Sequence, residues 1–370
     1  MKISACMIVK NEENVLKLTL PDLSRGADEI ILVDTGSTDG TIEVAKQFGA
    51  MVYHFPWTDD FSAARNESLK YATGDFILWV DADEFIAEEK IQKLRSVLLD
   101  IKEDAFYLPV YEAKFGQKEG TKFYFRLKGF KNKKGIHFER AFNEQVYDLS
   151  HQLVSSSLFL GGIEIFHWGT DLSEEKTKLK RERNLRILKK KLQDEPNDPY
   201  FHFMLANNYY ETGCFDLAFD CYGEVVKLLP NNHIAISSRI KRARILVKQK
   251  KFQDAYAELK SVLNLDSTNA EAFNLIGSIY ISTNNLPYAI KILEHASTLV
   301  LPQKSLKSFN VDDYTFLPRF LLANAYLLNG QKKEALETFT AAYEFKHDAN
   351  VLRRIEKLRV EIEGDKSNGR

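Results

Sequence analysis

Hydrophobic runs alternate with amphipathic stretches over the first hundred residues. Short runs of apolar and β-branched residues, predicted as buried strands, occupy residues 3–9, 29–33, 51–55 and 76–80. The stretches between them, with the apolar spacing of helices, are residues 13–23, 41–48 and 62–72. Strand–helix–strand alternation with short connections predicts an α/β domain, in which helices cover both faces of a parallel sheet. Residues 105–168 are rich in aromatic and β-branched side chains and are expected to form mixed strands and loops.

A helical pattern with an internal repeat begins at residue 173. The small residues of the repeat are Ala218, Ala255, Ala289 and Ala335, with Ala206, Ala243, Gly277 and Ala323 twelve positions earlier. Large residues, Tyr222, Leu259, Leu293 and Phe339, follow four positions later. Small and large residues in register, about 34 residues apart, are typical of tetratricopeptide repeats. We therefore expect a helical linker and an all-α solenoid over residues 173–363, an extra loop at residues 301–313, and a disordered tail at residues 364–370.

Net charge divides the chain into two parts. The 370 residues include 51 Lys and Arg and 52 Asp and Glu, but residues 1–172 carry −7 and residues 173–370 carry +6. This division of charge fits two domains with different functions, and we expect the first domain to span residues 1–172. A protein that is near neutral overall lacks the strong basic field of a nucleic-acid-binding protein, so no nucleic-acid partner is expected.

Cysteine content and hydropathy bear on the compartment. The three cysteines show no paired spacing, which argues against a disulfide framework and favours a reducing cytoplasm. The first apolar run, residues 3–9, is too short for a signal peptide, and no run approaches the ~20 apolar residues of a membrane span. We expect a cytoplasmic protein with no transmembrane segment.

Carboxylates follow two of the predicted strands. Asp81 and Asp83 come directly after residues 76–80, and side chains two apart in an extended segment share a face. Acids at the carboxyl end of a parallel strand lie where α/β sheets bind ligands, and paired carboxylates suit Mg²⁺ or Mn²⁺. The alternative is that these acids only cap the helix expected at residues 88–99.

Asp34 ends the second strand and opens a polar turn. The segment from Thr35 to Thr41 also reads as a simple turn followed by a helix N-cap, Thr38 or Asp39. Asp34-Thr35-Gly36 matches the signature of aspartic proteases, but that chemistry needs two such aspartates. The chain has no second copy and a helix is expected after the motif, so we reject the protease interpretation.

Taken together, these segments resemble a family 2 glycosyltransferase of the GT-A fold. The segments that carry the resemblance are residues 8–13 (IVKNEE), 33–41 (VDTGSTDGT), 57–66 (WTDDFSAARN) and 74–83 (GDFILWVDAD). With the trailing repeats, the chain is similar to the branch that contains the S-glycosyltransferases of glycopeptide bacteriocins. The resemblance implies that Asp34 binds the nucleobase or ribose of the donor, and that Asp81 and Asp83 contact the ribose and the metal on the donor diphosphate.

Three further residues receive roles from the resemblance. Arg65 matches an arginine on the donor side; a guanidinium can pair with phosphate or hold a neighbouring carboxylate such as Asp60, and the alternative is a helix-surface arginine. The branch usually has His-Glu where this chain has Asn143-Glu144, so Glu144 is the candidate general base or acceptor-binding carboxylate. His167 matches a histidine that completes the metal shell, although a strand histidine is more often structural.

The expected function is a metal-dependent, inverting glycosyltransferase that uses Mn²⁺ or Mg²⁺ and a UDP-sugar. The favoured acceptor is a Cys, Ser or Thr side chain of a peptide or protein, recognised by the repeats, which would also supply a homodimer contact. The basic stretch at residues 176–191, with nine Lys and Arg, is either a solvated helix face or a surface for an acidic acceptor. The alternatives are transfer to a cell-envelope glycan or lipid-linked sugar, and a tetratricopeptide scaffold with an inactive GT-A domain.

Overall fold

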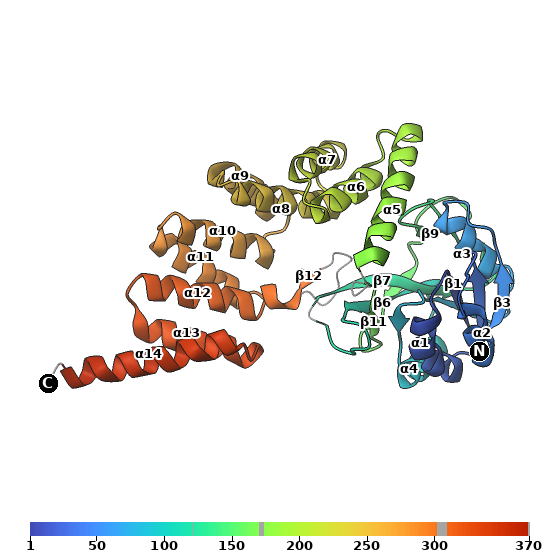
Figure 1. Cartoon of the computed structure of the whole chain (residues 1–370), viewed down its shortest axis with the longest axis horizontal. Coiled ribbons are helices and arrows are strands. Elements are labelled where there is room, and N and C mark those ends of the chain that lie inside the picture. The colour runs from blue at the N-terminus through green and yellow to red at the C-terminus, as the bar shows by residue number, and fades with distance from the viewer. Residues whose placement is uncertain (121, 170–173, 302–308, 369–370) are drawn as a thin grey trace. The chain divides into compact units, whose positions relative to one another are not determined.

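The chain divides into two compact units. The computed structural model describes residues 1–120, 122–169, 174–301 and 309–368 (Figure 1). The first unit runs through Met1–Leu188, and the second takes the described residues from 189 onward. Among the described residues, no helix combines the length and the apolar character needed to cross a membrane.

The division falls inside helix α5 (Glu174–Asp194), whereas the sequence predicted a boundary at residue 172. Side-chain contacts from Arg183 and Arg186 of α5 explain the difference. Arg186 Nη2 donates to Asp59 Oδ1 at 2.8 Å, and the Arg183 guanidinium lies 5.2 Å from the centre of the Phe61 ring. These contacts join residues up to 188 to the first unit.

The first unit is built on one mixed sheet with strand order β3-β2-β1-β4-β7-β6-β11-β5. The strands are β1 (Ile3–Val9), β2 (Glu29–Asp34), β3 (Met51–His54), β4 (Phe76–Trp79), β5 (Glu84–Phe85), β6 (Ala105–Glu112), β7 (Lys122–Lys131), β10 (Ser157–Phe159) and β11 (Ile165–His167). The four predicted strands, β1 to β4, are parallel, as expected. The sheet becomes mixed at β7, which pairs antiparallel with both β4 and β6. A separate antiparallel hairpin consists of β8 (His137–Glu139) and β9 (Gln145–Tyr147).

Helices cover both faces of this sheet. The helices of the unit are α1 (Glu13–Gly26), α2 (Thr41–Gln47), α3 (Phe61–Leu69) and α4 (Glu88–Leu98). Side chains alternate along each strand, so Met7 of β1 and Leu78 of β4 pack with α1, α2 and α4. Trp79 points to the opposite face, where it packs with Leu69 of α3 and with Phe138 of the β8–β9 hairpin. The predicted α/β sandwich is therefore confirmed.

The second unit is a series of antiparallel helix pairs, as the repeat predicted. Its elements are α6 (Pro199–Glu211), α7 (Phe215–Leu228), α8 (His233–Lys248), α9 (Phe252–Leu265), α10 (Ala270–Ser282), α11 (Leu286–Thr298), β12 (Phe309–Asn310), a 3₁₀ turn (Val311–Asp313), α12 (Phe316–Leu328), α13 (Lys332–Phe345) and α14 (Ala349–Asn368). The repeated alanines are completely buried between paired helices. At Gly277 an added Cβ would lie 2.5 Å from Leu293 Cδ2, so the pair α10–α11 leaves no room for a side chain.

Two predicted irregular segments turned out partly ordered. Of the expected loop at residues 301–313, residues 302–308 lie outside the described residues, and β12 and the 3₁₀ turn occupy the rest. Helix α14 continues to Asn368, so most of the segment predicted as a disordered tail is helical. Residues 369–370 lie outside the described residues.

Candidate active site

The polar motifs gather at the carboxyl ends of the parallel strands. Val9, the last residue of β1, is in register with Asp34, the last residue of β2. The Thr35 hydroxyl donates to the Val9 carbonyl at 3.0 Å, and the Thr38 N–H donates to Asn11 Oδ1 at 2.7 Å. The first two sequence motifs are thus joined side by side, at the edge where α/β sheets bind ligands.

Asp34 is 2% exposed and organises the turn that follows it. Its carboxylate accepts the backbone N–H groups of Gly36 and Ser37, each at 3.1 Å. The turn that the sequence offered as an alternative is therefore present, and Asp34 closes it. His54, which the sequence analysis did not single out, places Nδ1 3.4 Å from Asp34 Oδ2. No hydrogen bond or ion pair between described residues joins Asp34 to the acids after β4.

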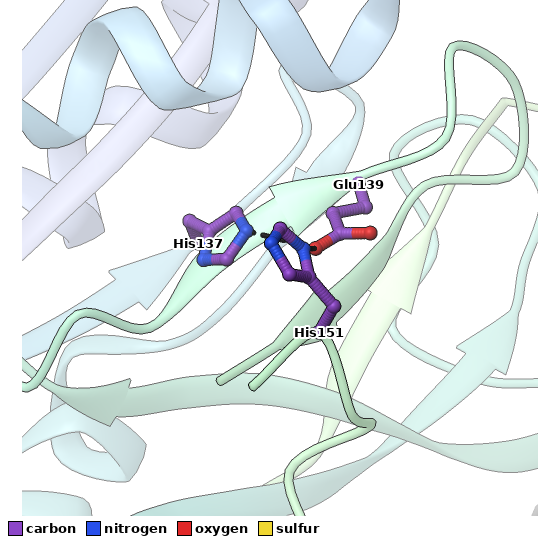
Figure 2. A group of neighbouring side chains, drawn as sticks. All are labelled: His137, Glu139 and His151. Carbon is purple, nitrogen blue, oxygen red and sulfur yellow. Dashed lines mark hydrogen bonds and ion pairs between the residues drawn. The ribbon is translucent and has the colours of Figure 1, made fainter. Parts of the chain in front are cut away.

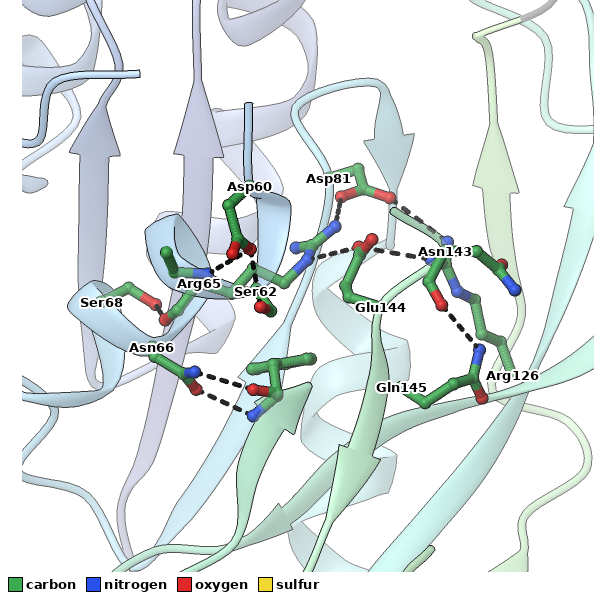
Figure 3. Close-up of polar contacts among 12 residues, drawn as sticks. Asp60, Ser62, Arg65, Asn66, Ser68, Asp81, Arg126, Asn143, Glu144 and Gln145 are labelled. Carbon is green, nitrogen blue, oxygen red and sulfur yellow. Dashed lines mark hydrogen bonds and ion pairs between the residues drawn. The ribbon is translucent and has the colours of Figure 1, made fainter. Parts of the chain in front are cut away.

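Arg65 connects two of the predicted site residues that are far apart in sequence. Its Nη2 donates to Asp81 Oδ1 at 2.5 Å and its Nε donates to Glu144 Oε1 at 2.7 Å (Figure 3). Arg65 is buried, so the helix-surface alternative is wrong. The suggested partner Asp60 is also wrong: it caps α3, accepting the Ala63 N–H at 3.0 Å.

Cations surround Asp81 on several sides. Arg126 Nη1 lies 3.3 Å from its Oδ2, opposite the Arg65 contact (Figure 3). Burial alone would raise the pKa of Asp81, but Arg65, Lys128 and Arg126 outweigh it and hold the pKa well below its usual range. Asp81 is accordingly a permanent anion, and part of it stays accessible at the end of β4.

A second ion pair lies beneath Asp81. Lys128 is completely buried, with Nζ 2.5 Å from Glu84 Oε2, and burial lowers the pKa of Lys128 to about 8 in spite of that carboxylate. Trp79 lies against all three cations: its ring centre is 3.8 Å from Lys128 Nζ, 4.4 Å from the Arg65 guanidinium and 4.5 Å from that of Arg126. The sequence analysis missed Arg126 and Lys128. The available signal was two cations two positions apart inside an aromatic-rich strand, β7, which also carries a lysine at each end.

Glu144 lies in the loop between β8 and β9, and the residue before it has a left-handed backbone conformation. Asn143 has φ 55°, a conformation that asparagine adopts more readily than most residues. Its carbonyl accepts Gln145 Nε2 at 3.4 Å (Figure 3). Glu144 is directed to Arg65, and Arg126 Nη2 lies 3.9 Å from the same oxygen, Oε1. Its other oxygen, Oε2, takes part in neither contact.

Asp83 and His167 form the other predicted pair. His167 Nε2 lies 3.5 Å from Asp83 Oδ2, and each side chain is 24% exposed. The Trp168 N–H donates to the Asp83 carbonyl at 2.8 Å, which fixes the backbone of the pair. Burial would lower the pKa of His167, but the hydrogen bond and charge of Asp83 raise it overall.

The surroundings of this pair fit a divalent cation. A Cβ added to Gly169 would lie 2.4 Å from Asp83 Oδ2 and 2.6 Å from His167 Nε2, so glycine alone leaves the two ligand atoms uncrowded. A carboxylate oxygen and an imidazole nitrogen are both common metal ligands, and Asp81 supplies further negative charge nearby. The residues present therefore fit the metal that the sequence predicted.

Comparison with known proteins agrees with this geometry. Residues 4–159 match the family model "Glycosyl transferase family 2". Most of the first unit is thus similar to the family 2 glycosyltransferases. The site residues described above, from Asp34 to Glu144, lie within the match, whereas His167 lies just beyond it. A second model, "Tetratricopeptide repeat", matches residues 199–232, which include α6 and α7.

Relatives match this chain over part of their own length. A "TPR repeat-containing protein" of Synechococcus elongatus is 36% identical over 218 residues, 57% of this chain and 53% of its own length. The "SPbeta prophage-derived glycosyltransferase SunS" of Bacillus subtilis is 30% identical over 214 residues, 56% of this chain and 49% of its own. The chain thus spans about half the length of these curated relatives. Among solved structures, S. aureus TarS 1-349 is 16% identical, with a TM-score of 0.41, over 70% of this chain and 90% of that one.

Proposed function

We propose that this protein is a metal-dependent, inverting glycosyltransferase that moves a sugar from a UDP-sugar to a peptide or protein side chain. The observation that carries the proposal is the Arg65 bridge. One buried guanidinium holds Asp81, an acid of the donor motif, beside Glu144, the candidate base, although the two are distant in sequence. The family 2 match supports the reaction class, and so does the SunS relative, whose name is that of a glycosyltransferase.

On the donor side, each residue has a distinct task. Asp34 presents carboxylate oxygens at the end of β2, where they can accept hydrogen bonds from the nucleobase or ribose. Asp81 is a permanent anion that accepts from ribose hydroxyls. Arg126 is partly exposed beside Asp81 and is the cation best placed to bind the donor phosphates.

Asp83 and His167 would hold the divalent ion of the donor diphosphate. Mn²⁺ suits this donor set better than Mg²⁺, because Mg²⁺ is usually bound through oxygen atoms alone. When bound, the ion neutralises the charge that develops on the departing nucleoside diphosphate. Gly169 keeps the two ligand side chains free of steric crowding.

Glu144 is the proposed base for the acceptor. Its contact with Arg65 uses Oε1, so Oε2 remains for the acceptor proton. A thiol needs less help from such a base than a hydroxyl does, because it reaches the thiolate more easily. A cysteine acceptor is therefore the better match, attacking the anomeric carbon from the face opposite the nucleotide.

The repeats are the proposed acceptor-binding surface. In the second unit, a hollow of about 490 Å³ is lined by Phe316, Phe320, Asp348, Asn350 and Arg354. Aromatic rings beside an arginine suit a peptide with apolar and acidic side chains. The same unit is proposed to supply a homodimer contact.

The thiols of Cys6, Cys214 and Cys221 are unpaired, which is the state expected in the reducing cytoplasm that we propose as the location.

The donor half of the proposal is tested with a panel of nucleotide sugars, following nucleotide release with and without Mn²⁺. Asp83→Ala should abolish the metal-stimulated release, whereas Asp100→Ala, an exposed acid of the same unit, should not. Asp34→Ala should weaken UDP binding. No release from any donor, by a folded protein that also fails to bind UDP, would favour the scaffold alternative.

The acceptor half needs a different measurement. Arg354→Ala should raise the acceptor KM and leave donor hydrolysis unchanged, while Arg359→Ala, on the same helix but outside the hollow, should leave both unchanged. Acceptors are captured from a lysate with labelled donor. Transfer to a glycan or lipid-linked sugar, with wild-type efficiency in Arg354→Ala, would establish the alternative acceptor class instead.

A further inference from the structure

Two histidines and a glutamate meet at the β8–β9 hairpin, apart from the donor motifs. His137 and Glu139 lie two positions apart on β8, and His151 reaches them from the loop after β9 (Figure 2). Glu139 Oε1 is 2.9 Å from His137 Nε2 and 2.5 Å from His151 Nδ1. One ligand atom from each of the three residues lies within 4.8 Å of the others.

The hydrogen bonding of His137 determines which of its ring nitrogens faces Glu139. Its Nδ1 lies 3.0 Å from the Gly135 carbonyl oxygen, which can only accept, so Nδ1 carries the proton. Nε2 then faces Glu139 Oε1 at 2.9 Å, as a donating N–H in the charged ring or as a lone pair in the neutral ring. In the neutral ring, Nε2 and the carboxylate oxygen can both bind a cation placed between them. A ring N–H that donates to a backbone carbonyl, with the other nitrogen free, is also how metal-binding histidines are normally held.

The donor set identifies the kind of cation. Two imidazole nitrogens and one carboxylate are ligands typical of Zn²⁺, whereas Mg²⁺ and Ca²⁺ prefer oxygen. Bonds of about 2.0–2.1 Å in tetrahedral geometry place ligand atoms about 3.4 Å apart. The contacts of Glu139 Oε1 with the two histidines, at 2.9 and 2.5 Å, must therefore lengthen by less than about 1 Å. His151, whose side chain is 75% exposed, can make that movement and leaves the fourth position open to water.

We propose that His137, Glu139 and His151 form a Zn²⁺ site distinct from the Asp83–His167 pair. The ion cross-links the loop at residue 151 to the hairpin. Glu139 pairs with Gln145, the neighbour of Glu144, and Phe138 is tied to α3 because its N–H donates to Asn66 Oδ1 at 2.8 Å. Zinc at this position therefore stiffens the hairpin that presents Glu144 to Arg65.

The test is a zinc titration of the full-length protein, first stripped of metal and exchanged into chelator-free buffer, in competition with a chromophoric chelator. His151→Ala and Glu139→Gln should each weaken one tight equivalent of Zn²⁺ by at least about 100-fold, since changes that only misorient a ligand already cost about 10–100-fold. His347→Ala, an exposed histidine of the second unit, and Asp83→Ala should both retain that equivalent. Circular dichroism checks that each variant is folded.

A second readout reports the ligands themselves. Co²⁺ added in place of Zn²⁺ should give the visible absorption of a four-coordinate ion in the wild-type protein, and this absorption should be lost in His151→Ala. Wild-type protein that binds no Zn²⁺ more tightly than His151→Ala and Glu139→Gln would overturn the proposal. Loss of the tight equivalent in Asp83→Ala would overturn it too, because the zinc would then belong to the donor site.

Discussion

Gly169→Ala should disturb Asp83 and His167, the proposed metal ligands, while leaving the fold intact. The new Cβ would lie 2.4 Å from Asp83 Oδ2 and 2.6 Å from His167 Nε2, whereas ordinary contacts to a Cβ begin at 3.4 Å. Both atoms are the far ends of side chains that can rotate, so the protein can relieve the contact by moving them. The relief must amount to about 1 Å, several times the ±0.2 Å within which metal–ligand distances normally fall.

Gly169→Ala should lower the affinity for the metal much more than it lowers the stability of the protein. A displacement of this size should weaken Mn²⁺ binding by about 10–100-fold. The free energy of unfolding should change by less than about 1 kcal/mol, because no buried packing is lost. Gly161→Ala is the matched control: nothing lies within 4 Å of a Cβ at that position in the same unit.

The assay is the Mn²⁺ dependence of donor hydrolysis, with urea denaturation of each variant alongside. Gly169→Ala should need a higher Mn²⁺ concentration for half-maximal rate, and saturating Mn²⁺ should restore part of the rate. Gly161→Ala should follow the wild type in both measurements. An unchanged Mn²⁺ dependence in a correctly folded Gly169→Ala protein would refute the assignment of this pair as metal ligands.

Three other substitutions test particular contacts. Arg65→Met removes the cation between two carboxylates and should lower the free energy of unfolding of the first unit, measured in urea, by about 3–5 kcal/mol. A loss below about 1 kcal/mol would contradict a stabilising role of the Arg65 bridge. Gly277→Ala should destabilise the second unit by about 1–3 kcal/mol, because the added methyl group meets Leu293, and unchanged thermal unfolding would contradict that close approach. Burial and Glu271 raise the pKa of Asp313 to about 7, so the folded protein holds an extra proton and loses stability as pH rises from about 4 to 7. In Asp313→Asn this loss should disappear, and at pH 8 the free energy of unfolding should exceed that of the wild type by about 2–4 kcal/mol. If the free energy of unfolding varied with pH in the same way in both proteins, the raised pKa of Asp313 would be contradicted.

The sequence alone was enough for the features that depend on local periodicity. Alternating and helical patterns placed β1 to β4 and α1 to α4 within a few residues of their positions, because strand and helix periods are properties of short segments. The repeat of small residues located the helix pairs, since only Ala or Gly allows such close packing. Asp81 and Asp83 could be placed at a ligand-binding edge because the carboxyl ends of parallel strands always meet there.

Tertiary structure alone decided which charged groups meet. Arg65 lies 16 residues from Asp81 and 79 residues from Glu144, and Lys128 lies 44 residues from Glu84. These pairs depend on the antiparallel course of β7 beside β4 and on the packing of the β8–β9 hairpin against α3, which no local pattern encodes. From the sequence, the carboxylate suggested for Arg65, besides a phosphate, was Asp60, its neighbour along the chain. Burial in the fold gave the guanidinium two other carboxylates, because a charge removed from water needs partners within hydrogen-bonding distance.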